Sequence, residues 1–278
     1  MAFMHNPGHA DPSNTGREWV TDCFDRLFDD AAIFPPGNAP MSEAVAAHRR
    51  WRASRQTGFV GPFVCSVARI DELRGVLGTD AESLDIALVC PADAYPDAVH
   101  DVLADNRMRL TAVELSPHDV LAPSVDMDDV MLYYELPWHS QADLPPGTGR
   151  KFRTGGPGAD HFPRADDLAR ALAFCVEQAE PFKLTAGLHH AIRHRDPQTG
   201  FEHHGFLNVL AAVDAAQDGA RPDVLAQILD SQDGDSITGR VTSIDDPSRV
   251  RSVFRSFGTC SIQEPLTDLQ QLALVEAM

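Results

Sequence analysis

The feature that most constrains the fold of this chain is a repeated pattern of short apolar runs, most of them followed by stretches with helical periodicity. Each run has the length of a β-strand, and strands that alternate with helices are the signature of β-α units. Successive runs begin roughly 20 to 30 residues apart, as expected for such units, with a longer gap before the last. The eight runs cover residues 27–36, 59–67, 84–91, 110–115, 130–137, 151–156, 181–187 and 254–262.

Eight such units in a chain of 278 residues favour a (β/α)8 barrel of the TIM type, which takes about 250 residues. The rival is an open, doubly wound sheet, which requires a glycine-rich turn after an early strand. Here the glycines cluster after the sixth, seventh and eighth runs instead. The clearest helical patterns cover residues 164–180, 204–216 and 221–231.

We therefore predict an α/β fold in which residues 19–278 form a single (β/α)8 barrel. A longer, histidine-rich insertion separates the seventh strand from the eighth. Residues 1–18 are rich in Asn, Pro, Gly and Ser, so we expect them to form a flexible lead-in without a signal peptide.

Composition excludes some classes of partner. The chain carries 41 acidic against 23 basic residues, a formal charge of −18, which opposes binding to nucleic acids and anionic membranes. No apolar run approaches the length of a membrane span. The five cysteines are odd in number and form no CxxC pair, so we expect reduced thiols in a cytoplasmic protein. A homo-oligomer is possible.

Two strands of the predicted barrel carry lysines on what should be their inner face. In "FKLTAG", alternation places Lys183 on the same side as Thr185, and in "RKFRTGG" it places Lys151 on the same side as Arg153. Three cations crowded in one lumen disfavour protonation, so we expect a lowered pKa for Lys183. A neutral amine can act as base or imine former, and Met keeps most of the bulk of lysine without that nitrogen. We therefore expect Lys183→Met to leave the fold intact and to abolish turnover.

The alternative for these lysines is structural. Lys151 or Lys183 could instead form an ion pair with Glu114 or Glu135, which lie near the ends of the fourth and fifth strands. Perturbed titratable groups gather at active sites but also occur in such structural networks.

The functional residues of a TIM barrel lie at the C-terminal ends of its strands. We expect Lys183 and Lys151 to act as nucleophile, base or carbanion-stabilising cation, and Glu135 as general acid and base. Arg153 and the glycine turns are suited to bind an anion through a guanidinium and backbone N–H groups. The candidate substrate-binding residues are Arg153, Thr154, Gly155, Gly156, Gly187, His189, His190 and Cys260.

Residues 151–187 resemble the sixth and seventh strands of deoxyribose-phosphate aldolase and related class I aldolases. Lys151 with Thr154 and Gly155 matches the Schiff-base strand of that family, and Lys183 with Gly187 matches its second lysine. The resemblance implies an imine-forming enzyme in which Lys151 is the nucleophile and Lys183 lowers its pKa. The chain departs from the pattern at Arg153 and in the Leu-His-His that follows Gly187.

A second resemblance covers more of the chain and carries no chemistry. The segments "DDAAIFPPG", "KFRTGG", "TAGLHH", "HGFLN" and "CSIQEP" are similar to segments of a bacterial protein family whose activity we do not know.

Five histidines lie within residues 189–204, and they raise the alternative of a metal site. His189, His190 and His204 could hold Zn²⁺ or Mn²⁺ together with a carboxylate. Adjacent histidines on an extended segment point in opposite directions, so we expect one of His189 and His190 to take part. No HExxH or HxH motif supports this site, and our first expectation is an enzyme without a cofactor.

The sequence thus predicts an enzyme that acts on a small anionic carbonyl or carboxylate compound by aldolase-like lyase or isomerase chemistry. One alternative is a metal-dependent hydrolase or lyase that uses the histidine-rich loop. The other is a barrel that binds a ligand without catalysis.

Overall fold

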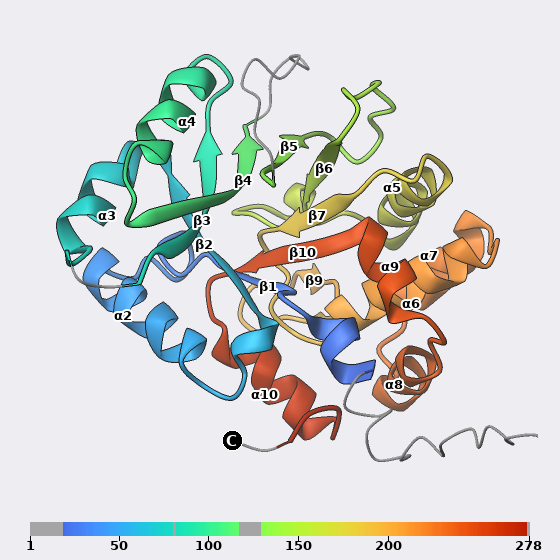
Figure 1. Cartoon of the computed structure of the whole chain (residues 1–278). Coiled ribbons are helices and arrows are strands. Elements are labelled where there is room, and N and C mark those ends of the chain that lie inside the picture. The colour runs from blue at the N-terminus through green and yellow to red at the C-terminus, as the bar shows by residue number, and fades with distance from the viewer. Residues whose placement is uncertain (1–18, 80–81, 117–128, 277–278) are drawn as a thin grey trace, which may run out of the picture.

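The computed structural model describes residues 19–79, 82–116 and 129–276, and the predicted lead-in at residues 1–18 lies outside these ranges. Eight strands close into one barrel in which every neighbouring pair is parallel (Figure 1). In order around the barrel they are β1 (Phe28–Asp30), β2 (Val60–Ser66), β3 (Leu84–Cys90), β4 (Met108–Leu115), β5 (Met131–Glu135), β6 (Thr148–Arg153), β7 (Phe182–Thr185) and β10 (Phe254–Thr259).

All eight predicted strands are therefore confirmed, with ends that differ by a few residues. The pairing of β1 with both β2 and β10 closes the sheet, which excludes the open, doubly wound alternative. Parallel strands buried on both faces read as nearly continuous apolar runs, and this property made the strands visible in the sequence.

In the first half of the barrel, one α-helix follows each of the first three strands. Helix α2 (Met41–Arg52) follows β1, α3 (Ile70–Val76) follows β2 and α4 (Tyr95–Leu103) follows β3. Residues 136–147, which join β5 to β6, form no helix.

The second half carries the longest connection, between β7 and β10. Helix α5 (Ala165–Glu177) follows β6, and the chain between β7 and β10 forms the predicted insertion. The insertion contains the two-stranded sheet β8 (His194–Arg195) and β9 (Glu202–His203), followed by helices α6 (Phe206–Gln217), α7 (Pro222–Asp230), α8 (Gly234–Thr242) and α9 (Pro247–Val253). Helix α10 (Gln263–Gln271) comes after β10. Figure 1 shows α6 to α9 gathered on one side of the barrel.

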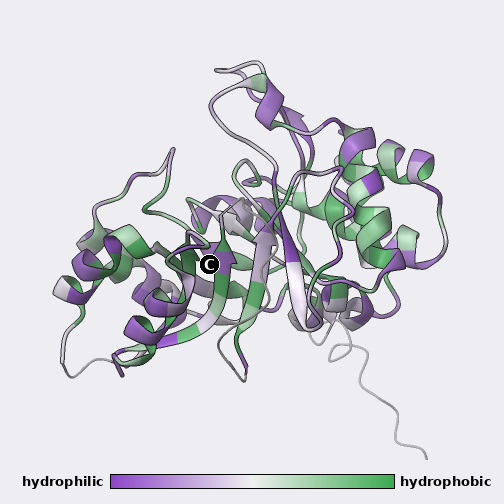
Figure 2. Ribbon diagram, turned by 90° about the horizontal axis from the view of Figure 1, so that it is seen from above, coloured by the Kyte–Doolittle hydropathy of each residue, from purple (hydrophilic) through white to green (hydrophobic). Residues whose placement is uncertain are grey.

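Two large apolar clusters lie between the barrel and its helices. One packs the outward residues of β6, β7 and β10, such as Phe152 and Leu184, against α5, α6 and α7. The other packs β2 to β5 against α2, α3 and α4. The helices in Figure 2 carry both hydrophobic and hydrophilic segments, as expected for helices with one buried side.

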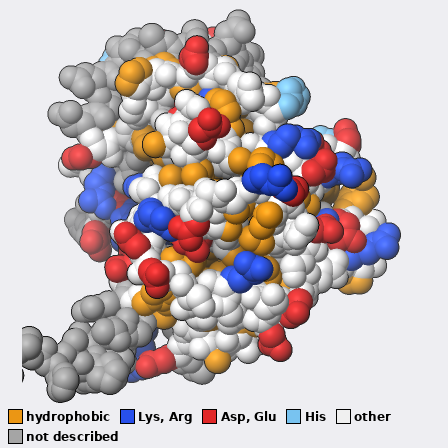
Figure 3. Space-filling model, turned by 90° about the vertical axis from the view of Figure 1, so that its right-hand side faces the viewer, with side chains coloured by type: hydrophobic (Ala, Val, Ile, Leu, Met, Phe, Trp, Pro, Cys, Tyr) orange, Lys and Arg blue, Asp and Glu red, His pale blue; other side chains and the backbone are white. Residues whose placement is uncertain are grey.

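The face over the insertion carries charges of both signs (Figure 3). Arg249, for example, forms ion pairs with Asp214 at 3.3 Å and Asp218 at 2.7 Å. This face therefore does not form a basic patch of the kind that binds nucleic acid. Within the described parts of the chain, no helix has the length and apolar character needed to cross a membrane.

Candidate functional site

A row of alternating charges crosses the lumen of the barrel. Lys183 of β7 donates a hydrogen bond to Asp29 of β1, at 2.6 Å, and a short one to Oε1 of Glu114 on β4. Lys151 of β6 lies 2.9 Å from Oε2 of Glu114 and 2.9 Å from Oε2 of Glu135 on β5. The pairs of Glu114 with Lys151 and Lys183, and that of Asp29 with Lys183, join strands that are not neighbours, so these side chains point inward, as alternation predicts.

Lys183 is a buried ammonium group, and the expected lowering of its pKa is wrong. Burial by itself lowers the pKa of Lys183, but the two carboxylates of Asp29 and Glu114 outweigh burial and raise it above its ordinary value. The sequence argument counted the neighbouring cations, whereas in the folded chain each lysine is separated from the next by a carboxylate. The structural ion pair considered as the alternative is therefore present.

Glu114 is the centre of the row because each of its oxygens binds a different lysine. Burial alone would raise its pKa, but Lys151 and Lys183 lower it to about 2. Asp29 differs, since burial raises its pKa and the contacts with Lys183 and Ser256 offset only part of that effect. Ser256 donates a hydrogen bond of 2.7 Å to Asp29. Glu114 is thus held as an anion.

The row leads from the buried lumen to solvent at the C-terminal ends of β5 and β6. Side-chain exposure rises from 4% at Lys151 to 9% at Glu135 and 46% at Arg153. The guanidinium of Arg153 lies 3.8 Å from the carboxylate of Glu135. Lys151, Glu135 and Arg153 therefore come together as predicted, and Arg153 lies at the mouth of the barrel.

The other end of the row faces the opposite mouth. Lys183 and Asp29 line a cavity of about 570 Å³ together with residues that precede or begin their strands, including Arg26, Asp129 and Arg255. Such residues lie at the N-terminal ends of the strands. The expectation that Lys183 lies at the C-terminal face is therefore wrong, because Lys183 lies near the start of β7 and not at its end.

The glycine turns after β6 and β7 pack directly against each other. A Cβ on Gly155 would lie 2.8 Å from the Cα of Gly187, and one on Gly187 would lie 2.7 Å from the carbonyl oxygen of Thr154. Thr154 also donates hydrogen bonds across the gap, from its N–H to Thr185 O at 2.8 Å and from its hydroxyl to Ala186 O at 2.6 Å. Gly155 and Gly187 lack side chains because the two turns pack against each other at these positions. Their presence is therefore explained without a bound anion.

Gly156 belongs to a different contact, because a Cβ there would meet the ring of His161 at 2.6 Å. Its lack of a side chain is thus explained by packing as well.

The paired histidines after β7 both bind carboxylates of α10. Nδ1 of His189 lies 2.9 Å from Glu264, and Nδ1 of His190 lies 3.1 Å from Asp268. The expectation that the two rings point in opposite directions is wrong, because both rings reach the same helix.

His204 is held apart from this pair and is fully buried. Its Nδ1 accepts a hydrogen bond from Arg193 at 3.2 Å, and its Nε2 donates to the carbonyl of Pro163 at 2.8 Å. Burial lowers the pKa of His204 to about 4, so the ring is neutral with both nitrogens occupied. Among the described residues, no group of three or more His, Cys, Asp or Glu side chains is arranged to hold a metal ion.

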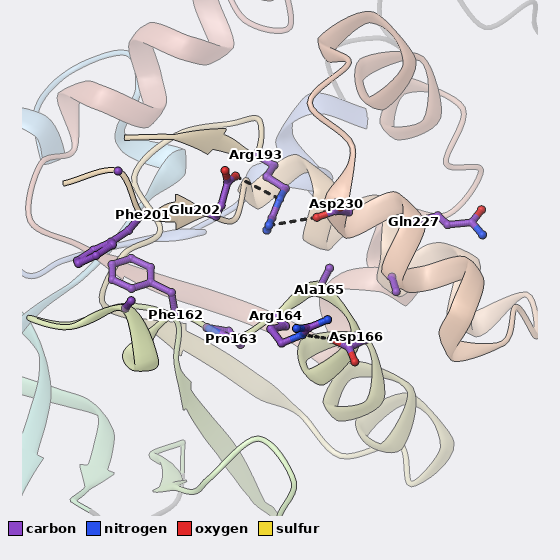
Figure 4. A pocket seen from close by; sticks show the side chains of 13 residues that line it. Phe162, Pro163, Arg164, Ala165, Asp166, Arg193, Phe201, Glu202, Gln227 and Asp230 are labelled. Carbon is purple, nitrogen blue, oxygen red and sulfur yellow. Dashed lines mark hydrogen bonds and ion pairs between the residues drawn. The ribbon is translucent and has the colours of Figure 1, made fainter. Parts of the chain in front are cut away.

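A second cavity, of about 690 Å³, lies among α5, the β8–β9 sheet and α7 (Figure 4). Arg193 points into it but is neutralised by Asp230 at 3.1 Å and faces Glu202 at 3.9 Å. Phe162 and Phe201 form its opposite wall, with ring centroids 5.3 Å apart. The cavity therefore offers an apolar wall beside compensated charges, and it does not include the lysine row.

Cys260 stands out among the five cysteines because the other four are buried. Its sulfur lies 3.8 Å from Nδ1 and 3.9 Å from Nε2 of His189. Cys260 and His189, which the sequence placed in the site, therefore contact each other, near the ends of β10 and β7.

Sequence reasoning missed Ser256, Tyr133 and Glu264. Simple alternation along β10 places Ser256 on the same side as Phe254, which packs outward, and an irregularity between these two residues turns Ser256 inward, so no signal for it was available in the sequence. The Tyr133 ring lies 5.6 Å from the Lys183 ammonium and was hidden in an apolar run. Glu264 lies in "CSIQEP", and its contact with His189 links segments 75 residues apart, which no local pattern reveals.

The fold and the row of charges together define the class of this protein as a closed, parallel α/β barrel of the TIM type with a charged lumen. Searches of family models, curated proteins and solved structures find no match to the chain. Its function must therefore be argued from its own residues.

Proposed function

We propose that the protein is an enzyme of the class I aldolase type, a lyase or isomerase in which Lys151 forms an imine with a small anionic carbonyl compound. The observation that carries the proposal is the placement of Lys151 between Glu114 and Glu135, one step inside the exposed Arg153. The resemblance of residues 151–187 to the Schiff-base strands of class I aldolases supports the same assignment.

Each member of the row has a distinct task. Arg153 binds the anionic group of the substrate at the mouth, since a guanidinium recognises carboxylate and phosphate. Glu135, which contacts both Arg153 and Lys151, accepts a proton from Lys151. The neutral amine attacks the carbonyl carbon, the C–N bond forms, and the carbonyl oxygen leaves as water. The reaction needs no cofactor.

Lys183 lies on the other side of Glu114 from Lys151 and acts as a fixed positive charge. It keeps Glu114 ionised, because it neutralises one of that carboxylate's oxygens while Lys151 binds the other. Its raised pKa makes it unsuited to form the imine itself. This assignment replaces the lysine nucleophile first expected at residue 183 with a lysine that positions charge.

Borohydride trapping tests the proposal. The protein is incubated with small phosphorylated or carboxylated aldehydes and ketones, reduced with borohydride, and mapped by mass spectrometry. We expect a stable adduct on Lys151, no adduct in Lys151→Met, and a higher carbonyl concentration for half-maximal labelling in Arg153→Gln. An adduct on Lys183, or none on Lys151 with any compound, would contradict the proposal.

A ligand-binding barrel without catalysis is the second candidate. It is favoured by the 570 Å³ cavity at the N-terminal mouth, which ends on Lys183 and Asp29, and by the mutual neutralisation of the row. If it is correct, a ligand will protect the protein from heat while no lysine is trapped by borohydride.

A further inference from the structure

Cys260 lies in a setting unlike that of the other cysteines. Burial raises the pKa of Cys23, Cys65 and Cys175 to about 12 and that of Cys90 to about 11, so these four are inert thiols. Cys260 is only partly buried, and its sulfur lies beside the His189 ring, nearly equidistant from the two nitrogens.

The tautomer of His189 is determined by its neighbours. Nδ1 lies 2.9 Å from the Glu264 carboxylate and 3.2 Å from the hydroxyl oxygen of Thr259. The Thr259 hydroxyl donates its own proton to the Ser261 carbonyl at 3.1 Å. Nδ1 must therefore carry a hydrogen that it donates to Glu264 and Thr259. Nε2 is left to take the proton of Cys260, which requires the thiol to rotate toward it, because the sulfur lies no nearer to Nε2, at 3.9 Å, than to Nδ1, at 3.8 Å.

We propose that Cys260, His189 and Glu264 form a nucleophilic thiolate site at the C-terminal rim of the barrel, which attacks an electrophilic carbonyl carbon. Nucleophile, base and orienting carboxylate follow one another in contact, which is the arrangement that activates a thiol. The site is separate from the lysine row, and the proposal does not depend on imine chemistry at Lys151.

The covalent step balances within these residues. His189 takes the thiol proton on Nε2, and the thiolate forms a C–S bond with the carbonyl carbon. The π electron pair of the C=O bond moves to oxygen. His189 then returns its proton to that oxygen or, with an ester, to the leaving alkoxide as the C–O bond breaks. No oxidant, reductant or further reactant is needed.

The groups around His189 favour its protonated form. Burial lowers its pKa, but Cys260 and Glu264 outweigh burial and raise the pKa to about 9. His190 and His203 also face the ring and oppose its charge, while Asp268 neutralises His190 at 3.1 Å.

Alkylation by iodoacetamide, mapped by mass spectrometry on the full native chain, measures the reactivity of each cysteine. An ordinary thiol has a pKa of about 8.5 and loses roughly tenfold in rate for each pH unit below it. We expect Cys260 to react first, and its rate to fall less than about fivefold between pH 8 and pH 6. A fall approaching a hundredfold, or alkylation of another cysteine first, overturns the proposal.

His189→Gln and its neighbour His190→Gln are matched variants, because each ring contacts one carboxylate of α10. We expect His189→Gln to slow alkylation of Cys260 at pH 6 at least tenfold, and His190→Gln to leave it within about twofold. Equal losses in both variants would mean that the loop merely packs against Cys260, and would overturn the pairing. If a variant fails to fold, the pH dependence of Cys260 alkylation in the wild type still tests the proposal.

The carbonyl preference is tested with 4-nitrophenyl acetate. Attack by Cys260 releases 4-nitrophenolate and leaves an acetyl thioester on the cysteine. We expect this adduct in the wild type and in Lys151→Met, and not in His189→Gln. Absence of the adduct from the wild type overturns the carbonyl assignment. An adduct that persists in Lys151→Met shows that the attack by Cys260 does not use the lysine of the imine proposal.

Discussion

The two walls of the barrel lumen are built on the same backbone pattern but carry opposite chemistry. On one side, Val64, Ala87 and Ala112 of β2, β3 and β4 form a small apolar cluster with Tyr133. On the other, β5, β6 and β7 contribute Glu135, Lys151 and Lys183, and Glu114 near the end of β4 and Asp29 of β1 complete the charged wall, with all five side chains buried. The apolar wall shows that this barrel can fill its centre without charges.

The charged wall therefore needs a reason beyond closure of the barrel. Removing ions from water costs several kcal/mol each, and replacing a buried ion pair with apolar residues is often neutral or stabilising. Five buried charges in one row are thus an expensive way to fill a lumen. Because perturbed groups gather at functional sites, the difference between the walls is the strongest sign that the lumen has a chemical role.

The largest predicted effect comes from removal of Lys183, the most buried charge of the row. Lys183→Met leaves Asp29 without its cation and Glu114 with one of two, so we expect a loss of about 3 to 5 kcal/mol in the free energy of unfolding. This corresponds to a fall of roughly 6 to 20 °C in Tm. It reverses the expectation, from sequence alone, that the variant keeps an intact fold.

The double variant Lys183→Met with Glu114→Gln is the control for this effect. It removes one charge of each sign, so it should lose less stability than the two single variants added together, by about 1 to 3 kcal/mol in a urea-unfolding cycle. Additive losses would show that the two side chains do not interact, and would erase the distinction between the walls.

The second effect is a loss of unfolding free energy in acid, which we expect the charged wall to cause and the apolar wall not to cause. The pKa of Glu114 is about 2 in the folded chain, below the value of about 4.3 in an unfolded one. Its contribution to stability is fully present above pH 4.3 and is lost as pH falls toward 2. The difference amounts to about 3 kcal/mol.

Asp29 acts in the opposite sense, because its pKa is raised and its contribution is lost as pH rises above its unfolded value. The test for Glu114 is therefore a comparison of variants. Glu114→Gln should show a shallower loss of unfolding free energy than the wild type between pH 5 and pH 2.5. Parallel curves for the two proteins would contradict the assignment of a lowered pKa.

The same contrast explains what could be predicted from the sequence. Apolar runs determine strands through periodicity alone, so the barrel and the inward direction of Lys151 and Lys183 were predictable. The protonation of Lys183 was not, because it depends on Asp29 and Glu114, which lie 154 and 69 residues away along the chain. Local patterns identify which residues enter a lumen, but the order of charges around it follows from strand register and barrel closure.

The smallest predicted effect belongs to the apolar wall. Val64 is buried and its pairing in register with Ala87 places it in the apolar cluster. Val64→Ala removes two carbon-sized groups at about 0.8 kcal/mol each, so we expect a loss of about 1 to 2 kcal/mol in urea unfolding. Because no titratable group is changed, that loss should be the same at pH 7 and pH 4, and trapping at Lys151 should be unaffected. A loss that grows in acid, or weaker trapping, would show that the apolar wall supports the charge row, and the two walls would then have to be treated as one site.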